Sequence, residues 1–206
     1  RILEFFDHAG FSLGSNHVID CEVHAGRLVA AGGSEEPPER GERSEIDYSD
    51  PAANDYEALT RDRVAVSSLR RDEAAALARI DRRITGRDRS GYLAQMVDEA
   101  LDDSAVRVSL VARVDGIARG FVMAKVDFGD FGRTEPVAVI DTLDVAPEYA
   151  HHGVGHALLS QLFLNLDALR IERVETVVDR KAFALLGFFY DVGFAPGQRL
   201  AFVKTL

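Results

Sequence analysis

The stretch VAVIDTLDVAPEYAHHGVGHALLSQL, residues 137–162, predicts a buried strand, a turn with two glycines and an amphipathic helix in direct succession. The strand is predicted from apolar, mostly β-branched residues with a period of two: Val137, Val139, Leu143 and Val145. Pro147 ends the strand, because proline cannot donate to a ladder. Backbone amides should therefore gather where the strand passes into the helix.

The helix is expected to begin at the glycines, because apolar residues fall at helical spacing from there: Val154, Ala157, Leu158, Leu162 and Phe163. Gly153 and Gly155 are expected to take positive φ and to let a ligand approach the main chain. Free N–H groups and the helix dipole favour phosphate oxygens at such a turn. A G-x-G turn before a helix can also be purely structural, so the motif alone does not decide between the two.

Two longer sequence patterns support a functional role for this turn. They are L-x-V-x-P-x-Y-x-x-x-G-x-G, from Leu143 to Gly155, and FF-x-x-x-GF, from Phe188 to Phe194. Together with the order of elements they resemble the GNAT superfamily of acyl-CoA N-acyltransferases, over roughly residues 61–206. The resemblance implies an α/β (α+β) fold. Its sheet would be mixed and mostly antiparallel, with helices on both faces and a parallel pair of strands splayed at the coenzyme A site.

The resemblance also implies acetyl-CoA as the acyl donor. In the family, the equivalent of Ala150–Ala157 holds the pyrophosphate, and the equivalent of Leu143–Val145 pairs its backbone with the pantetheine arm. The implied cofactor-binding residues are Leu143, Asp144, Val145, Ala150, His151, His152, Gly153, Val154, Gly155, His156 and Ala157. The family usually carries Arg or Gln where this chain has Ala150, so the two histidines that follow are candidates for the missing donors.

Acyl transfer to an amine requires a neutral amine, a stabilised oxyanion and a proton for the leaving thiolate. Asp141 and Asp144 are the acidic residues of the strand, and a carboxylate is costly to bury there, so each is a candidate catalytic group. We favour Asp141, because GNAT enzymes often place an acidic base on this strand ahead of the L-x-V segment. Either aspartate could instead pair with a loop arginine. Backbone N–H groups near Val145, where a bulge is expected, are candidates for holding the oxyanion.

The usual proton donor of the family is a tyrosine four residues before the glycine of the Gly-Phe pair. This chain has Phe189 at that position and Tyr190 directly after it. One residue on a helix rotates a side chain by about 100°, so Tyr190 is a candidate acid that points in a different direction. Three functions therefore stay open: an N-acyltransferase, a catalytically silent acyl-CoA-binding or scaffold module, and an interaction domain without a coenzyme A site.

The acceptor site is expected beside a loop between two helices, one running from Arg71 to Gly86 and the other from Tyr92 to Leu101. Arg87 and Arg89 lie on this loop and could hold a substrate carboxylate, although a solvated loop would look the same. The acceptor itself is expected to be the amine of a small molecule or peptide. Further strands are predicted at 63–69, 107–116, 118–128, 173–179 and 199–206.

Composition restricts the remaining possibilities. A net charge of −10 argues against nucleic acid, which needs clustered Lys and Arg, and no apolar run reaches the length of a membrane span. Cys21 is the only cysteine, so neither an internal disulfide nor a cysteine-based metal site is expected, and cytoplasm is the expected compartment. His151, His152 and His156 have no acid or cysteine within their turn, so no metal is expected there.

A repeat in the sequence predicts the domain organisation. The residues Leu3, Phe5, Phe6, Gly10, Phe11 and Gly14 match Leu186, Phe188, Phe189, Gly193, Phe194 and Gly197 at one constant separation. We interpret residues 1–28 as the last helix and strand of a preceding GNAT-like domain, 29–60 as an acidic Pro/Gly-rich linker and 61–206 as a GNAT domain. The strand around Val18 and Ile19 is expected to dock on a sheet edge of the second domain or of a neighbouring chain, as in a homodimer.

Overall fold

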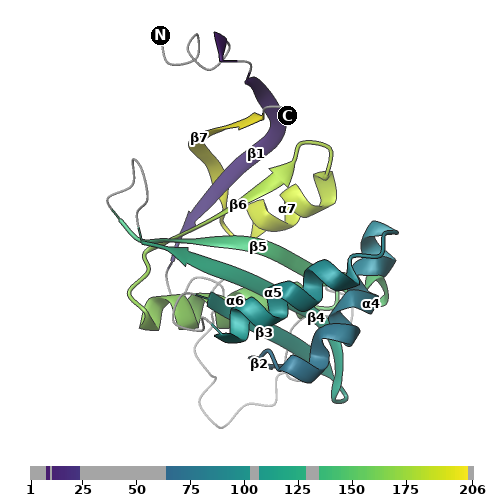
Figure 1. The fold of residues 1–206 in the computed structure, drawn as a ribbon. Helices are drawn as coiled ribbons and strands as arrows, with labels where there is room; N and C mark the ends of the chain where they lie inside the picture. The colour runs from purple at the N-terminus through teal and green to yellow at the C-terminus, as the bar shows by residue number, and fades with distance from the viewer. Residues whose placement is uncertain (1–7, 10, 24–63, 103–106, 129–134, 204–206) are drawn as a thin grey trace, which may run out of the picture.

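The computed structural model describes residues 8–9, 11–23, 64–102, 107–128 and 135–203. Its centre is one seven-stranded sheet in the order β2-β3-β4-β5-β6-β1-β7 (Figure 1). The strands are β1 (Ser12–Glu22), β2 (Ala65–Ser68), β3 (Arg107–Val114), β4 (Ile117–Asp127), β5 (Val137–Val145), β6 (Arg173–Asp179) and β7 (Ala195–Val203). All pairings are antiparallel except that of β5 with β6. The predicted mixed, mostly antiparallel sheet is confirmed.

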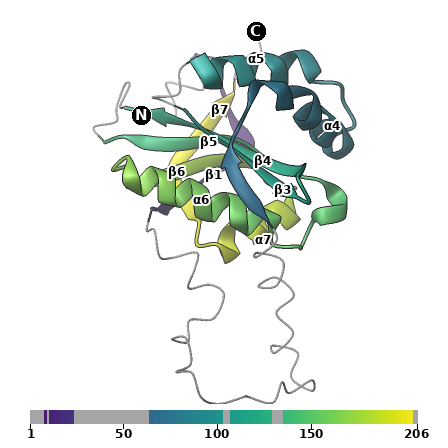
Figure 2. The ribbon, with the colours of Figure 1, turned by 90° about the horizontal axis from the view of Figure 1, so that it is seen from below.

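Helices cover both faces of the sheet, as predicted. They are α4 (Ala74–Thr85), α5 (Ser90–Asp102), α6 (Val154–Ala168) and α7 (Phe183–Asp191), with short 3₁₀ turns η1 (Arg71–Glu73) and η2 (Pro147–Tyr149). Figure 2 shows α4 and α5 on one side of the sheet and α6 and α7 on the other. Within the described ranges, no helix has the length and apolar character needed to cross a membrane.

Local sequence signals explain where several elements end. Gly86 caps the C-terminus of α4 with φ 69°, a left-handed conformation that glycine adopts without steric cost. Asp115 and Gly116 join β3 to β4 with φ values of 52° and 76°, as a two-residue hairpin turn requires. Helix α6 begins at Val154 with Gly153 as its N-cap, where the sequence predicted its start.

Strand β5 carries its bulge at a different place from the predicted one. Thr142 pairs with Met123 of β4 and Ile140 pairs with Ala124, so Asp141 is the extra residue of the ladder. The bulge expected near Val145 is therefore wrong. A bulge reverses the alternation of faces: Ala138 and Ile140 before it, and Leu143 and Val145 after it, all pack toward the core under α6. The single period of two assumed for the strand is also wrong.

The two parallel strands separate soon after they meet. Strand β5 pairs with β6 only from Ala138–Val174 to Ile140–Thr176. The hydroxyl of Thr176 donates to the carbonyl oxygen of Ile140 at 3.0 Å and closes the paired region. Beyond this point, residues 142–145 pair with β4 alone within the described chain, so one backbone edge of β5 is open.

Strand β1 lies inside the sheet, between β6 and β7, and is antiparallel to both. Within the described residues this strand therefore lies in the interior of the sheet, and not at a sheet edge as expected. The reason is visible in its burial: Ile19, Cys21 and Val23 are only 0%, 5% and 6% exposed and belong to the main core. The linker predicted at 29–60 and most of the helix predicted before β1 lie outside the described residues.

Candidate functional site

The turn between β5 and α6 places two residues in left-handed backbone conformations. His151 has φ 61° and Gly153 has φ 73°. Gly155 does not take the positive φ predicted for it, and its lack of a side chain has another cause. A Cβ atom on Gly155 would lie 3.1 Å from the ring of Phe188, because α7 packs against the first turn of α6. Gly155 therefore permits helix packing, and only Gly153 is required by the turn itself.

The first turn of α6 presents unpaired amides. The N–H of Ala157 donates to the carbonyl of Gly153 at 2.9 Å, which is the first bond of the helix. Within the described residues, the N–H groups of 153–156 have no backbone or side-chain acceptor. Four such donors at the positive end of a helix dipole fit the oxygens of a diphosphate.

The side chains of the turn leave these amides accessible. Ala150, His151 and His152 are exposed, and the Nδ1 atom of His152 lies 2.7 Å from the carbonyl oxygen of Ala150. The imidazole of His156 packs edge-on against Phe188, with ring centroids 5.2 Å apart. The main-chain amides of the turn are therefore open to a ligand, and the exposed rings of His151 and His152 stay candidates for further donors.

Asp144 lies at the end of β5 and faces helix α4. The pKa of its carboxyl is raised from 3.8 to about 6, chiefly by burial and also by the nearby charge of Asp81, while Arg89 opposes the shift. The Oδ2 atom of Asp144 is buried without a hydrogen-bond partner among the described residues. A half-buried carboxylate with one oxygen that has no hydrogen-bond partner among the described residues, and with a pKa near neutrality, suits a general base.

Asp81, which the sequence analysis did not single out, is the negatively charged residue that raises the pKa of Asp144. It is fully buried on α4, where the Nε atom of Arg89 donates to its Oδ2 at 3.0 Å and the Nη2 atom donates to its Oδ1. The missed signal was its spacing: Asp81 follows Leu77 by four residues on the apolar stripe of α4. Ile84, which has the helical spacing to continue that stripe, is instead 45% exposed.

The remaining candidates lie farther from Asp144. Asp141 is exposed at the bulge, and Arg107 and Lys125 oppose the rise in its pKa that partial burial causes. Arg87 is exposed on the α4–α5 loop, whereas Arg89 is committed to Asp81 by two N–H groups. The structure therefore brings together Asp144, Asp81 and Arg89, and it leaves Asp141 and Arg87 outside this cluster.

On α7, the two aromatic residues at the expected acid position differ in environment. Phe189 is 1% exposed and packs on Phe194, with ring centroids 4.8 Å apart. Tyr190 is 43% exposed. The position where the family carries its usual tyrosine is thus filled by a core phenylalanine, and Tyr190 lies beside it with an exposed side chain.

An ionic contact joins the two sides of the site. The Nη1 atom of Arg83 on α4 donates to Oε1 of Glu148 at 2.6 Å, and Glu148 belongs to η2, directly before the turn. The guanidinium of Arg119 lies 4.6 Å from the ring centroid of Tyr149 in the same 3₁₀ turn. These contacts hold α4, which carries Asp81, against the segment that leads into the amide donors.

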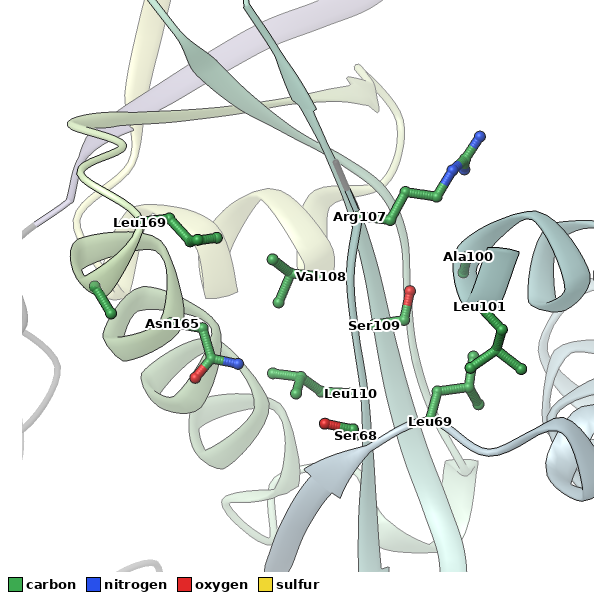
Figure 3. Close-up of a pocket in the computed structure, with 11 residues that line it drawn as sticks. Ser68, Leu69, Ala100, Leu101, Arg107, Val108, Ser109, Leu110, Asn165 and Leu169 are labelled. Atoms are coloured by element: carbon green, nitrogen blue, oxygen red, sulfur yellow. The ribbon is translucent and has the colours of Figure 1, made fainter. Parts of the chain in front are cut away.

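A cavity of about 380 Å³ lies at the other end of α6 (Figure 3). Asn165 and Leu169 of α6, Val108 of β3 and Leu101 of α5 contribute to its walls. Gly153 and Asn165 are roughly 18 Å apart along the helix at 1.5 Å per residue. This cavity is therefore separate from the turn and from Asp144.

Residues 72–194 match the Acetyltransferase (GNAT) family, which is more than half of the chain of 206 residues. The chain therefore belongs to the GNAT acetyltransferase family. No curated protein sequence matches it significantly.

Solved structures with the same fold include several aminoglycoside acetyltransferases. The 6'-N-acetyltransferase AAC(6')-Ih from Acinetobacter baumannii superposes with a TM-score of 0.59 at 17% identity, covering 69% of this chain and 98% of that one. AAC(6')-Iy in complex with CoA gives 0.60 at 14% identity, covering 69% and 94%. An enzyme from an uncultured soil metagenomic sample, in complex with sisomicin, gives 0.58 at 18% identity, covering 70% and 97%. At these identities the likeness shows the fold alone.

A charge at the first turn of α6 tests the amide donors. His156→Asp is expected to weaken acetyl-CoA binding about tenfold or more by repelling the phosphates. Both variants lose the ring contact with Phe188, but His156→Asp should be at least as stable as His156→Asn, because an acidic residue in the first turn of a helix is favourable. Isothermal titration calorimetry and thermal melting measure the two effects. His156→Asn is the matched control, and equal affinities for the two variants would place the phosphates elsewhere.

Proposed function

We propose that this protein is an acyl-CoA-dependent N-acyltransferase that transfers an acyl group, with acetyl-CoA as the donor, to an amine of a small molecule or peptide. The observation that carries the proposal is the position of Asp144. This half-buried carboxyl, with its raised pKa, lies on the same strand whose open edge leads into the amide donors of α6. A base for the amine and a cradle for the donor thus lie at one end of β5.

Asp144 is proposed as the general base. The attacking nitrogen gives up a proton as its bond to the acyl carbon forms, and the carboxylate of Asp144 accepts that proton directly or through one water. A base is needed because a lysine-like amine with a pKa near 10.4 is almost fully protonated at neutral pH and cannot attack in that form. The structure favours Asp144 over Asp141, because Asp144 has a buried free oxygen whereas Asp141 is exposed.

The donor fits the chain's own groups at the open edge of β5. In antiparallel pairing, alternate N–H groups of residues 141–145 point away from β4, toward the space where β6 has diverged. These groups are the proposed donors to the acyl oxygen. Acetyl-CoA supplies a thioester, whose sulfur leaves readily because a thiol has a pKa near 8.5. Water, or the exposed hydroxyl of Tyr190, protonates the departing sulfur.

Two measurements test the proposal in sequence. Calorimetric titration with acetyl-CoA should show micromolar or tighter binding, and release of free thiol in a panel of amines should then identify the acceptor. The panel begins with aminoglycosides, because the sisomicin complex shows such an amine bound to the same fold. Absence of acetyl-CoA binding by the folded protein would refute the proposal.

A second function is favoured by one observation, the burial of Phe189 where the family usually places a tyrosine. In this case the chain is a silent module that binds acyl-CoA as a sensor or scaffold. Micromolar acetyl-CoA binding without thiol release from any amine in the panel would support this alternative over catalysis.

The pH profile distinguishes Asp144 as a base. Since the carboxylate form is the active one, kcat/KM should rise with pH through about 6 and level off above it. Asp81→Asn removes a negative charge that raises the pKa of Asp144, so it should move this limb to lower pH. Asp88→Asn, on the exposed α4–α5 loop, is the control. A limb that stays in place in Asp81→Asn would show that another group titrates.

A further inference from the structure

Within the described residues, the strand half of the sequence repeat is also repeated in the structure. Strand β1 begins at Ser12, directly after Gly10-Phe11, and β7 begins at Ala195, directly after Gly193-Phe194. The two starts are 183 positions apart, which is the separation of every matched residue of the repeat, such as Gly14 and Gly197.

The pairing of β1 with β7 carries the same irregularity in both strands. Leu13 pairs with Phe202, His17 with Leu200, and Ile19 with Pro196. The extra residues of β1 therefore lie between Leu13 and His17, and those of β7 lie between Pro196 and Leu200, which are the repeat-equivalent positions. Exchanging the two strands reproduces the pattern, so a local two-fold axis passes through the pair His17–Leu200.

The position of β1 shows what it completes. Strands β6 and β7 are both antiparallel to β1, so they run parallel to each other with a slot of one strand between them. Helix α7 connects them across this slot. The chain from 64 to 203 thus leaves the slot to be filled, and β1 fills it with the buried side chains of Ile19 and Cys21.

The same two-fold axis predicts a further neighbour for β7. Strand β7 ends the sheet, and within the described residues its outer edge pairs with no strand. Since β1 has β6 on its far side, the two-fold axis requires a strand equivalent to β6 on the far side of β7. An open edge of this kind is a template for strand addition.

We propose that β1 is the last strand of a preceding acetyltransferase-like domain in the same polypeptide, and that the two domains exchange strands. The preceding domain inserts β1 into the slot of this domain. In return, β7 enters the slot that β1 left, and its outer edge pairs antiparallel with the preceding domain's equivalent of β6. The sheets of both domains then become continuous across the β1–β7 pair.

The partner is a preceding domain, rather than a second copy of this chain, because only the preceding domain has a β6-equivalent strand with an unpaired edge. In a second copy, the slot beside β6 is already filled by that copy's own β1, so its β6 has no free edge to offer. The domain that has lent its last strand is the one whose β6 equivalent remains open.

Hydrogen–deuterium exchange measured by mass spectrometry tests the exchange of strands. The chain of residues 1–206 is compared with the polypeptide extended to its natural start. Peptides from residues 195–203 should exchange about tenfold more slowly in the extended polypeptide, because the outer edge of β7 becomes paired. Peptides from residues 12–22 should be equally protected in both, since β1 is seated in each.

The extended sequence supplies an independent check. The pattern L-x-V-x-P-x-Y-x-x-x-G-x-G, or a recognisable variant, should occur 183 positions before Leu143–Gly155. Equal exchange of residues 195–203 in both proteins, or an upstream sequence without this strand-turn-helix pattern, would overturn the proposal. Protection of these residues that rises with the concentration of the chain 1–206, together with a dimer in light scattering, would also overturn it in favour of a second copy.

Discussion

Replacing Asp144 with asparagine is expected to lower kcat/KM for acyl transfer by about 100-fold or more, because asparagine cannot accept the proton from the attacking amine. The affinity for acetyl-CoA should remain nearly unchanged, since the proposed phosphate donors are main-chain groups of α6. Steady-state kinetics at pH 8 and calorimetry separate the two effects.

Asp141→Asn is the matched control for this variant, because it makes the same chemical change three residues earlier on β5. Because Asp141 is exposed, its replacement should change the rate only slightly. A large loss of rate in Asp141→Asn together with normal activity in Asp144→Asn would reverse the assignment.

The stability of Asp144→Asn is informative as well. The pKa of Asp144 is about 6 in the folded chain against 3.8 for an ordinary aspartate, so the folded state binds more protons between these values. The contribution of this group to folding stability therefore decreases as the pH rises from 3.8 to about 6. At neutral pH the asparagine variant should melt at the same or a higher temperature than the parent. Loss of activity without loss of stability would indicate a functional group.

Ile19→Asp should cause the largest loss of stability. Ile19 is fully buried in the centre of β1, and the substitution removes an aliphatic side chain worth about 1.5 to 3 kcal/mol and buries a carboxyl in its place. The midpoint of thermal unfolding should fall by roughly 10 °C or more. Circular dichroism during heating measures the change.

Val177→Asp adds the same charge to the neighbouring strand β6, at a side chain that is 50% exposed, and is the control, with an expected loss of about 1 kcal/mol or less. Should the two variants melt together, β1 would contribute little to the core. The fold would then be stable without a strand between β6 and β7. This would contradict the inference that β1 fills a required place in the sheet.

The strand, the turn and the helix of residues 137–168 could be predicted because their signals are local. Apolar spacing located β5 and α6, and Gly153 marked the boundary between them. The bulge at Asp141 could not be predicted, because it inserts one residue without any local marker. That single residue decides that Asp144, rather than Asp141, faces α4. The choice between two aspartates thus depended on the pairing of β5 with β4.

Gly155 and Asp81 show two further limits. Gly155 is needed because the ring of Phe188 lies against it, and this contact joins residues more than thirty positions apart. The sequence showed Asp81 only as a charge on an apolar stripe. Its partner Arg89 was assigned to a substrate carboxylate, because the loop that returns Arg89 to α4 has no sequence signature. Tertiary contacts, rather than local propensity, define this half of the site.

The burial of Cys21 has a practical consequence for the assays above. Its thiol is the only one in the chain, and it is 5% exposed on β1 with Sγ 3.4 Å from the carbonyl oxygen of Glu22. A thiol-reactive dye should therefore label released coenzyme A at once and the protein only when β1 leaves the sheet. In the absence of substrate, the rate of slow labelling would then measure how often β1 opens. Cys21 serves as the probe, so no label needs to be introduced.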